Sequence, residues 1–478
     1  MEAGSRYLRN PGAAGAGDGN GGRFRDDAGA PSGIGRFVGA VPHNGAMPDT
    51  LPDWLAYIER QHPRSIAMGL DRVREVAARM RLGRPARQVV TVAGTNGKGS
   101  TVAFIEAIAR AAGWRVGAYT SPHLLAYNER VRVDGRDADD ASLVAAFEAV
   151  ETARTGAGDG DGSGDVPLTY FEYGTLAALR LFERSALDLA ILEVGLGGRL
   201  DAVNVVDPDV AVITTVDLDH QDWLGEDRER IGFEKAGIAR AWKPLVLGDA
   251  DPPSSVLGHA YAIGASAWRI DNDFFFERVD ADRWRWREVG CELDLPLPAL
   301  AAPVQLRNAA TAIAALRALD GAIPDEAWAE GVAAARLPGR LQRFVRDGVE
   351  IVVDVGHNPQ AARELAAWLD AAPAAGRELA VYGALGDKDV AGVVDALGGR
   401  IDAWFLAGLE SAGPRGIPVD ALAGRLAGTA AARGGRHPDV DTALSAALDQ
   451  ARAGDRILAF GSFHTATAAL QWLAARGS

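Results

Sequence analysis

Short apolar runs alternate with longer stretches of helical periodicity along this chain after residue 50. Helical patterns such as residues 101–112 and 171–185 lie between several of these runs. Short apolar runs separated by helices are typical of a parallel sheet covered by helices, so the pattern predicts an α/β fold with a central, mostly parallel sheet. The strand-like runs of this first series are residues 89–93, 116–119, 189–194, 210–215 and 245–247.

A second series of strand-like runs begins near Val349, which indicates a second, smaller α/β domain. Residues 301–340 have a helical pattern that is broken by Leu337, Pro338 and Gly339. A chain of 478 residues exceeds what one hydrophobic core usually organises. We therefore predict one domain over residues 47–338 and another over 339–478. The runs of the second series are residues 351–355, 379–384, 403–407 and 457–460.

The first 46 residues have a different composition, rich in Gly, Ala, Asp and Arg and without apolar periodicity. Such a segment buries too little apolar surface to offset its ordering entropy, so we expect a disordered tail over residues 1–46. Met47 stands where the globular pattern begins. The hypothesis that Met47 is the true start would be refuted by N-terminal sequencing of native protein with an intact tail.

Composition narrows the classes of function. The apolar share of 48% suffices for real cores, yet no apolar run approaches the roughly 20 residues of a membrane span, and no secretory signal is visible. A single cysteine, Cys291, excludes an internal disulfide framework and favours a cytoplasmic location. The net charge of −14 argues against nucleic-acid or membrane partners. We expect small-molecule substrates and a monomer.

The segment from Gly94 to Ser100 carries the clearest chemical signal. An apolar run stops at a glycine-rich loop with one lysine, Lys98, and a helical pattern follows at once. This order builds a phosphate-binding loop from backbone N–H groups, a helix N-terminus and one positive charge. The loop departs from the strict G-x-x-x-x-G-K-[ST] pattern, because Gly99 separates Lys98 from Ser100. Nucleotide binding is nevertheless favoured over a plain glycine-rich turn.

Two other loops invite wrong interpretations. Residues 159–164 match the first half of an EF-hand calcium loop, but Tyr170 occupies the twelfth position, where a bidentate glutamate belongs. We expect no flanking helix pair there and interpret the loop as a flexible acidic insertion. Residues 195–198 miss the dinucleotide fingerprint, since Leu200 replaces its third glycine, so we predict no NAD site.

Three of the predicted strands end in groups that bind cations. Glu193 ends one run, Ser121 follows another, and His220 follows a third through Asp217 and Asp219. Open α/β sheets place ligands at such strand ends, so these donors together favour a metal site. Individually, Ser121 also fits a helix cap, Glu193 a solvated carboxylate and His220 a packed or surface imidazole. An imidazole ligand suggests zinc or manganese, whereas triphosphate chemistry favours magnesium.

Together with several further blocks, these residues make the chain resemble the bifunctional dihydrofolate synthase/folylpolyglutamate synthase family of bacteria, within the Mur-ligase superfamily. The similar blocks keep their order and cover nearly everything after residue 50. They are residues 92–101, 121–124, 168–174, 192–202, 218–220, 234–238, 337–340, 354–359 and 461–465. The resemblance implies a P-loop ATPase domain followed by a Rossmann-like C-terminal ligase domain.

The resemblance also implies roles for individual residues. Magnesium would be held by Ser121, Glu193 and His220, and Lys235 matches a lysine that family members carry as a carbamate. As a bare lysine, Lys235 is most simply a cation on a helix surface. A monovalent cation is a further cofactor that the resemblance admits. Residues implied to bind ATP are Thr95, Asn96, Gly97, Lys98, Gly99, Ser100, Asn308, Arg340 and Asp354. Residues implied to contact pteroate are Ser65, Ile66, Ala67, Met68, Thr169, Tyr170, Phe171, Glu172, Leu200, Asp201 and Ala202.

The activity that the resemblance implies is an ATP-dependent amide ligase. It would add L-glutamate to dihydropteroate and to folates through an acyl phosphate, with Lys98, Lys235 and His357 as catalytic residues. His357 would orient the phosphoryl group or the incoming glutamate, although a cap or packing role fits it nearly as well. Three alternatives stay open: a folylpolyglutamate synthase without the dihydropteroate reaction, a nucleotide-dependent switch, and a Mur-type cell-wall ligase, which the folate-family blocks disfavour.

Overall fold

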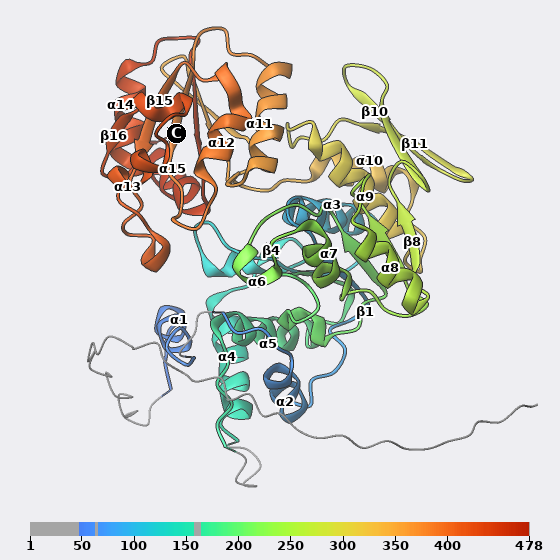
Figure 1. The fold of residues 1–478 in the computed structure, drawn as a ribbon. Helices are drawn as coiled ribbons and strands as arrows, with labels where there is room; N and C mark the ends of the chain where they lie inside the picture. The colour runs from blue at the N-terminus through green and yellow to red at the C-terminus, as the bar shows by residue number, and fades with distance from the viewer. Residues whose placement is uncertain (1–46, 63–65, 157–163, 478) are drawn as a thin grey trace, which may run out of the picture. The chain divides into compact units, whose positions relative to one another are not determined.

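An eight-stranded sheet organises the N-terminal half of the described chain (Figure 1). The computed structural model describes residues 47–62, 66–156 and 164–477. The strand order is β4-β3-β2-β5-β1-β6-β7-β8, parallel from β2 to β8, with β3 and β4 antiparallel at one edge. The strands are β1 (Ala86–Ala93), β2 (Val116–Tyr119), β3 (Val131–Val133), β4 (Arg136–Asp137), β5 (Leu187–Glu193), β6 (Val210–Ile213), β7 (Pro244–Leu247) and β8 (Ser266–Arg269).

Helices cover both faces of this sheet, because successive strand side chains point to opposite sides. In β1, Val89 and Ala93 join one buried core, whereas Val90 and Val92 join the other. The first core is completed by α1 (Leu51–Ile58), α2 (Asp71–Arg79), α4 (Asp140–Arg154), α5 (Tyr170–Glu183), α7 (Arg228–Ala236) and α8 (Ser254–Ile263). The second is completed by α3 (Lys98–Ala111), α9 (Val304–Arg317) and α10 (Asp325–Ala334). Three short elements lie in loops: η1 (Tyr127–Arg130), η2 (Ala202–Val205) and α6 (Gln221–Leu224).

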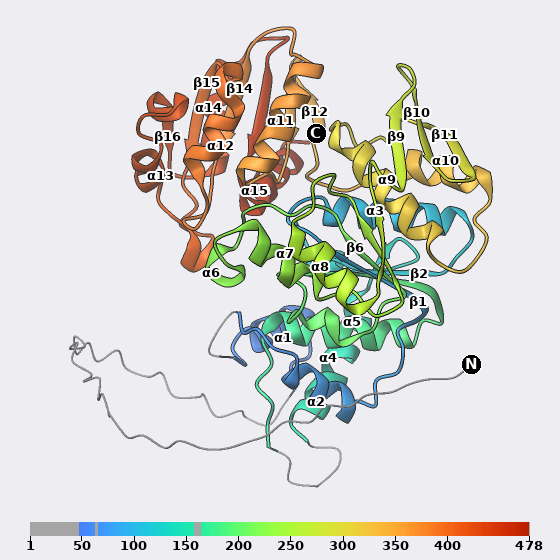
Figure 2. The ribbon, with the colours of Figure 1, turned by 45° about the vertical axis from the view of Figure 1, so that its right-hand side comes forward.

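A small antiparallel sheet extends the second core. It is formed by β9 (Phe274–Arg278), β10 (Arg283–Glu288) and β11 (Cys291–Pro296), and β9 packs against α9 while β11 packs against α10 (Figure 2). Trp284 and Trp286 alternate with arginines along β10 and are fully buried. The indole N–H of Trp286 donates to the backbone oxygen of Ala310 at 3.1 Å. These two sheets and their helices are called the N-terminal lobe below.

A six-stranded sheet, called the C-terminal lobe with its helices, is built entirely from residues after 341 (Figure 1). Its order is β12-β13-β17-β14-β15-β16, with only β12 antiparallel. Buried side chains form one core on each face. The strands are β12 (Gln342–Arg346), β13 (Val349–Val353), β14 (Glu378–Tyr382), β15 (Ala403–Ala407), β16 (Gly435–His437) and β17 (Arg456–Phe460). The helices are α11 (Pro359–Ala371), α12 (Val390–Leu397), η3 (Gly398–Arg400), η4 (Gly413–Arg415), α13 (Val419–Arg425), η5 (Ala430–Arg433), α14 (Val440–Gln450) and α15 (Phe463–Ala475).

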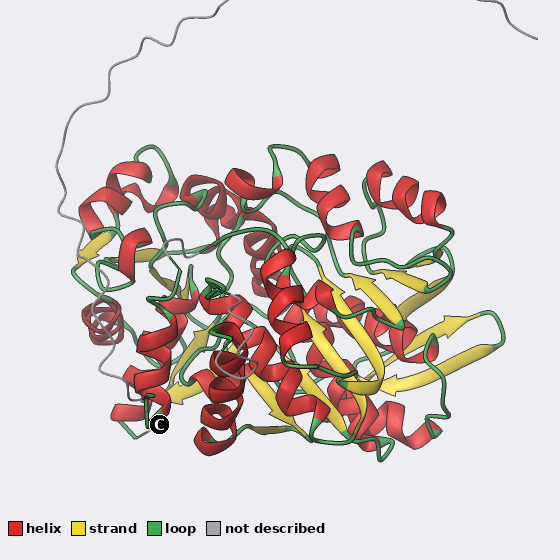
Figure 3. Ribbon diagram, turned by 90° about the horizontal axis from the view of Figure 1, so that it is seen from below, coloured by secondary structure: helices red, strands yellow, loops and turns green. Residues whose placement is uncertain are grey.

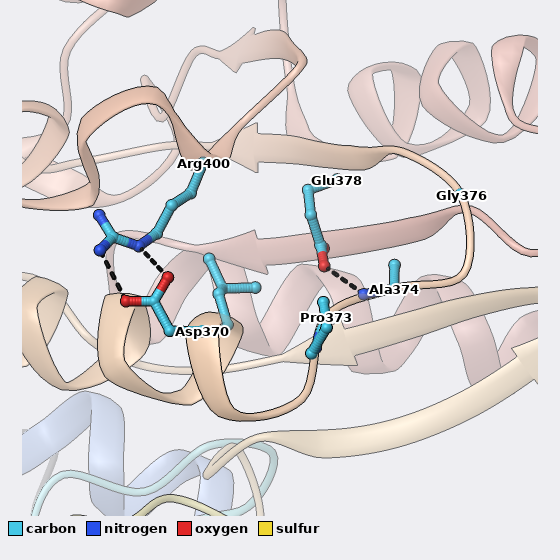
Figure 4. A pocket seen from close by; sticks show the side chains of 7 residues that line it. Asp370, Pro373, Ala374, Gly376, Glu378 and Arg400 are labelled. Atoms are coloured by element: carbon cyan, nitrogen blue, oxygen red, sulfur yellow. Dashed lines mark hydrogen bonds and ion pairs between the residues drawn. The ribbon is translucent and has the colours of Figure 1, made fainter.

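A small cavity of about 310 Å³ lies in the C-terminal lobe where α11 ends (Figure 4). Arg400 donates two 2.7 Å hydrogen bonds to Asp370 at its rim. One carboxylate oxygen of Glu378 accepts from the backbone N–H of Ala374 at 3.0 Å. The same carboxylate oxygen accepts from Arg456 at 2.8 Å, and Arg456 also donates to Glu350 at 2.6 Å.

The predicted α/β fold class is confirmed, and Figure 3 shows the strands lying among helices. Every strand-like run of both series lies in a strand, with ends shifted by a few residues. Residues 301–340 form two helices, α9 and α10, rather than a continuous one, because Pro324 opens the second. Among the described residues, no helix is long and apolar enough to cross a membrane.

One expectation about the acidic insertion is wrong, and other expectations are not tested by the structure. The expectation that no helix pair flanks the acidic insertion is wrong, because α4 ends at Arg154 and α5 begins at Tyr170. Residues 159–163 of the insertion and the predicted tail over residues 1–46 lie outside the described residues. The division at residues 338 and 339 stays a prediction.

Candidate active site

One cavity of about 1170 Å³ gathers every predicted site residue that the structure describes. It opens at the carboxyl ends of β2, β5, β1 and β6, which are neighbours in the sheet, and it is also lined by the C-terminal lobe. Parallel strands carry their ligands at this edge, so the sheet order explains why distant segments of the chain meet here. The predicted pteroate contact Ser65 lies outside the described residues.

The predicted phosphate loop connects β1 to α3. Gly97 caps α3 with a left-handed backbone (φ 87°) and no side-chain cap, so the first N–H groups of the helix stay open to an anion. A Cβ at Gly97 would lie 2.7 Å from the amide oxygen of Asn308, which explains the glycine. The ammonium group of Lys98 donates to the backbone oxygens of Gly94 and Thr95 at 3.0 and 3.2 Å.

The predicted metal ligands surround this loop. The backbone N–H of Ser121 donates to Glu193 at 3.3 Å, and the Glu193 side chain is buried rather than solvated. Burial raises the pKa of Glu193 although the charge of Lys98 opposes the shift. Burial lowers the pKa of His220 to about 4, which leaves a neutral imidazole able to bind a cation. A bound cation would compensate the buried carboxylate, so the donor set fits one.

Two further titratable groups of the cavity, Lys235 and Asp201, are buried. Lys235 is 3% exposed, so its interpretation as a helix-surface cation is wrong: it lies on the inner side of the last turn of α7. Burial, reinforced by the charge of Lys98, lowers the pKa of Lys235 to about 7. Asp201 accepts from the backbone N–H groups of Leu196 and Val203, and burial raises its pKa to about 7.

The predicted pteroate segment starts α5. Thr169 and Glu172 form a reciprocal capping box, and Glu172 also accepts from Arg72 at 2.7 Å. The cap fixes the first turn of α5, which carries Tyr170 and Phe171 on the cavity wall. We call the part of the cavity lined by residues 66–68, 169–172 and 200–202 its acceptor end.

The connection between the lobes supplies Arg340, and the C-terminal lobe supplies Asp354 and His357. Asp354 accepts from the backbone N–H groups of Leu341 and Gly356 at 2.9 and 2.6 Å, which shapes the loop around it. Arg340 lies over the Phe463 ring, and burial lowers its pKa although the nearby carboxylates of Asp354 and Glu193 oppose the shift. The His357 ring pairs one nitrogen with the backbone oxygen of Val355 at 3.0 Å.

Contacts between the two lobes identify residues that sequence reasoning missed. Lys388 pairs with Asp219 at 2.8 Å, and both side chains are largely buried. Burial disfavours the Asp219 carboxylate, but His357, His220 and Lys388 outweigh this effect and hold its pKa below the usual range. Lys388 follows the strand-like run 379–384, so the strand-end argument applied to the first series of runs would have found it.

A second set of contacts reaches the phosphate loop itself. The Asn96 side chain exchanges 3.1 Å hydrogen bonds with Asn358 and also donates to Gln360. Asn358 caps α11 by accepting from Ala361, so the loop is tied to the first turn of that helix. Among the described residues, no cluster of three or more His, Cys, Asp or Glu side chains is placed to hold a metal. The predicted ligand set contains only two residues of these types, because its third member is Ser121.

Two known protein families match this sequence, and their ranges include the phosphate loop and most of the residues that line the cavity. Residues 92–315 match the Mur ligase middle domain, and residues 339–463 match the Mur ligase glutamate ligase domain. The fold is thus that of a Mur ligase.

More specific similarity exists to individual proteins. The dihydrofolate synthase/folylpolyglutamate synthase of Escherichia coli K12 is 46% identical over 429 residues, covering 90% of this chain and 96% of the relative. The solved structure of E. coli FolC in complex with DHPP and ADP is 45% identical with a TM-score of 0.83, covering 90% of this chain and 99% of that one. A bifunctional relative with Mn, AMPPNP and L-glutamate bound is also 45% identical, with a TM-score of 0.80 over 89% of this chain and 98% of that one. The chain belongs to the dihydrofolate synthase/folylpolyglutamate synthase family, and the resemblance predicted from the sequence is confirmed.

Proposed function

We propose that this chain is an ATP-dependent amide ligase that adds L-glutamate to 7,8-dihydropteroate, forming dihydrofolate, and to folates, forming polyglutamates. Family membership supports the reaction class. The observation that carries the proposal is the single cavity in which Lys98, Glu193 and His357 meet from three different segments. A nucleotide switch would not need an acceptor end in the same cavity.

The chemistry follows from the poor reactivity of a carboxylate toward an amine. An acceptor carboxylate oxygen attacks the γ-phosphorus of ATP, ADP leaves, and an acyl phosphate remains. The amino group of glutamate then attacks the acyl carbon, loses a proton, and expels inorganic phosphate as the amide forms. Lys98 and the open N-terminus of α3 would hold the phosphates, alongside the other residues implied to bind ATP. Arg340, in the connection between the lobes, would contact ATP. His357, in the C-terminal lobe, would orient the phosphoryl group or the incoming glutamate.

The donor set described above supports a divalent cation held by Ser121, Glu193 and His220. The related structure with Mn and AMPPNP supports the same class of ion, and triphosphate chemistry favours magnesium as the physiological choice. When bound, such an ion neutralises charge on the phosphate oxygens. The buried Glu193 carboxylate would then carry a compensated charge.

The Lys235 amine is suited to carbamate formation, because a pKa of about 7 leaves a large neutral fraction at physiological pH. The neutral amine is the form that adds CO2; it forms an N–C bond and releases one proton, and the product is an anionic carbamate. We propose this modification. ¹³C NMR of protein equilibrated with labelled bicarbonate should show a carbamate signal, and the signal should be absent in Lys235→Met. The monovalent cation stays a prediction.

A product assay tests the proposal directly. Dihydropteroate and tetrahydrofolate are each incubated with enzyme, ATP, magnesium and L-glutamate, and mass spectrometry counts the glutamates added. Addition to both acceptors is expected. Addition to tetrahydrofolate alone indicates a folylpolyglutamate synthase, and ADP release that needs neither acceptor nor glutamate indicates a switch. Lys98→Ala is expected to abolish turnover with the fold intact, so a variant that keeps most activity contradicts the assignment of the phosphate loop.

The remaining expectations belong to the same proposal. We expect two domains, residues 47–338 and 339–478, whose closure aligns ATP with the acceptor and excludes water. A monomer in the cytoplasm is expected as well. Limited proteolysis with and without an ATP analogue tests the division, and size-exclusion chromatography with light scattering tests the oligomeric state.

A further inference from the structure

Arg130 lies at the end of η1 and lines the cavity next to the acceptor end. Its guanidinium carbon is 5.4 Å from the ring centroid of Tyr127 and 5.6 Å from that of Tyr170. Its Nε group donates to Nδ1 of His123 at 2.8 Å. Two aromatic rings and one hydrogen bond therefore fix the plane of this guanidinium before any ligand arrives.

The group that holds Arg130 does not neutralise it. His123 accepts through Nδ1, and burial together with the charge of Arg130 lowers the pKa of His123 to about 4. The imidazole is accordingly neutral at physiological pH, and the tyrosine rings carry no formal charge. Arg130 keeps a full positive charge inside a cavity of a protein whose net charge is −14.

Nearby arginines are arranged differently. Arg72 pairs with Glu172 at 2.7 Å, and Arg132 pairs with Glu106 at 2.7 Å. Within residues 47–62, 66–156 and 164–477, Arg130 has no carboxylate partner, and its two terminal nitrogens donate no hydrogen bond. Those nitrogens form the planar fork that matches a carboxylate.

We propose that Arg130 binds a carboxylate of the acceptor substrate. This inference rests on the proposed function, in which every acceptor is a carboxylic acid. Dihydropteroate carries only the carboxylate that reacts, whereas tetrahydrofolate also carries the α-carboxylate of its glutamate. His123 acts as a positioning residue, because it occupies Nε and leaves the fork free for the ligand.

Binding of the acceptor in the absence of ATP tests the inference. The experiment compares substitutions of Arg130 with ligands that carry or lack the carboxylate. Dissociation constants are measured by calorimetry for dihydropteroate, for its analogue lacking the carboxylate, and for tetrahydrofolate. Arg130→Gln is expected to weaken tetrahydrofolate binding by about 10- to 100-fold, as the loss of a charged hydrogen-bonded pair does, and to leave the analogue without a carboxylate within about twofold. Arg130→Lys keeps the charge but not the fork, so an intermediate loss is expected.

The pattern across ligands locates the carboxylate. Loss for both dihydropteroate and tetrahydrofolate assigns Arg130 to the reacting carboxylate, and loss for tetrahydrofolate alone assigns it to the α-carboxylate. Equal loss for the analogue without a carboxylate, or no loss for any ligand, overturns the inference. If Arg130→Gln does not fold, the same contrast between ligands is read on Arg130→Lys.

A matched variant and one independent assay complete the design. Arg136→Gln removes an exposed arginine of β4, in the hairpin that follows η1, and is expected to change none of the three constants. Turnover of the unaltered enzyme is measured separately. Acceptor binding that depends on Arg130 without glutamate addition refutes the proposed function alone, whereas normal turnover with unaltered Arg130→Gln binding refutes this inference alone. Failure of the unaltered enzyme to bind any acceptor refutes both.

Discussion

The buried amine of Lys235 makes the stability of the protein depend on pH in a predictable direction. Its pKa is about 7 in the folded chain against an ordinary value of 10.5, because burial disfavours the ammonium form. Between these values the unfolded chain binds a proton that the folded chain does not. The free energy of unfolding therefore rises with pH across this window, and the penalty is complete below pH 7.

The size of the effect follows from the two pKa values. Their difference corresponds to about 5 kcal/mol over the whole window, of which about 2 kcal/mol is recovered between pH 7 and pH 9. Lys235→Met removes the titrating group while keeping a side chain of similar length. The variant is expected to lack this gain, so the two proteins should differ by about 2 kcal/mol in how much they stabilise over that interval.

Urea titrations at pH 7 and pH 9, followed by circular dichroism, measure this difference. The buffers must be free of CO2, since a carbamate would replace the titrating ammonium. Lys243→Met, which removes an exposed lysine, serves as the control and should keep the pH dependence of the unaltered protein. Equal gains in stability for Lys235→Met and the unaltered protein would refute the assignment of a neutral buried amine.

Three further substitutions test other parts of the structure. Gly97→Ala places a Cβ 2.7 Å from the Asn308 amide oxygen in a left-handed backbone. The resulting strain of about 1–2 kcal/mol should weaken binding of an ATP analogue about tenfold, and unaltered affinity in a calorimetric titration would contradict it. Lys388→Met leaves the Asp219 carboxylate buried without its cation and should lower the free energy of unfolding by about 3 kcal/mol in urea titrations, whereas a loss below about 1 kcal/mol would show that the pair is dispensable. Trp286→Ala should lose about 3–5 kcal/mol on thermal unfolding, and Trp286→Phe, the milder control, should lose less; equal losses would argue against a packing role.

The parts of the site that the sequence predicted are those fixed by local order along the chain. A phosphate loop needs a strand, glycines and a helix start in succession, and residues 89–101 supply all three. Ser121 and Glu193 could be grouped before the structure because parallel strands share one edge for their carboxyl ends. That rule requires only that the ends of the strands be known. The strand order, which the sequence did not predict, additionally makes β2, β5, β1 and β6 neighbours.

The features that were not predicted are of two kinds. Some depend on contacts between distant segments, and one had a sequence pattern that was not interpreted. The burial of Lys235 and the pairing of Lys388 with Asp219 depend on packing between distant segments, although the position of Lys388 after a predicted strand was visible in the sequence. The β9–β11 sheet is a different case. Arginine and tryptophan alternate along residues 283–287, which is the period of a half-buried strand, so this signal was present in the sequence.

The chain passes from one lobe to the other only once within the described residues, in the connection between Ala334 and Gln342. Neither large sheet borrows a strand from beyond that connection. Expressed as separate polypeptides, the two halves would each keep every strand of their large sheet, although Leu124 of the first half is buried in a core of the second. Hydrogen bonds such as those from Asn96 to Asn358 and Gln360 would then join two molecules, and their dissociation constant, measured with and without nucleotide, would report directly how strongly ATP favours the joined state.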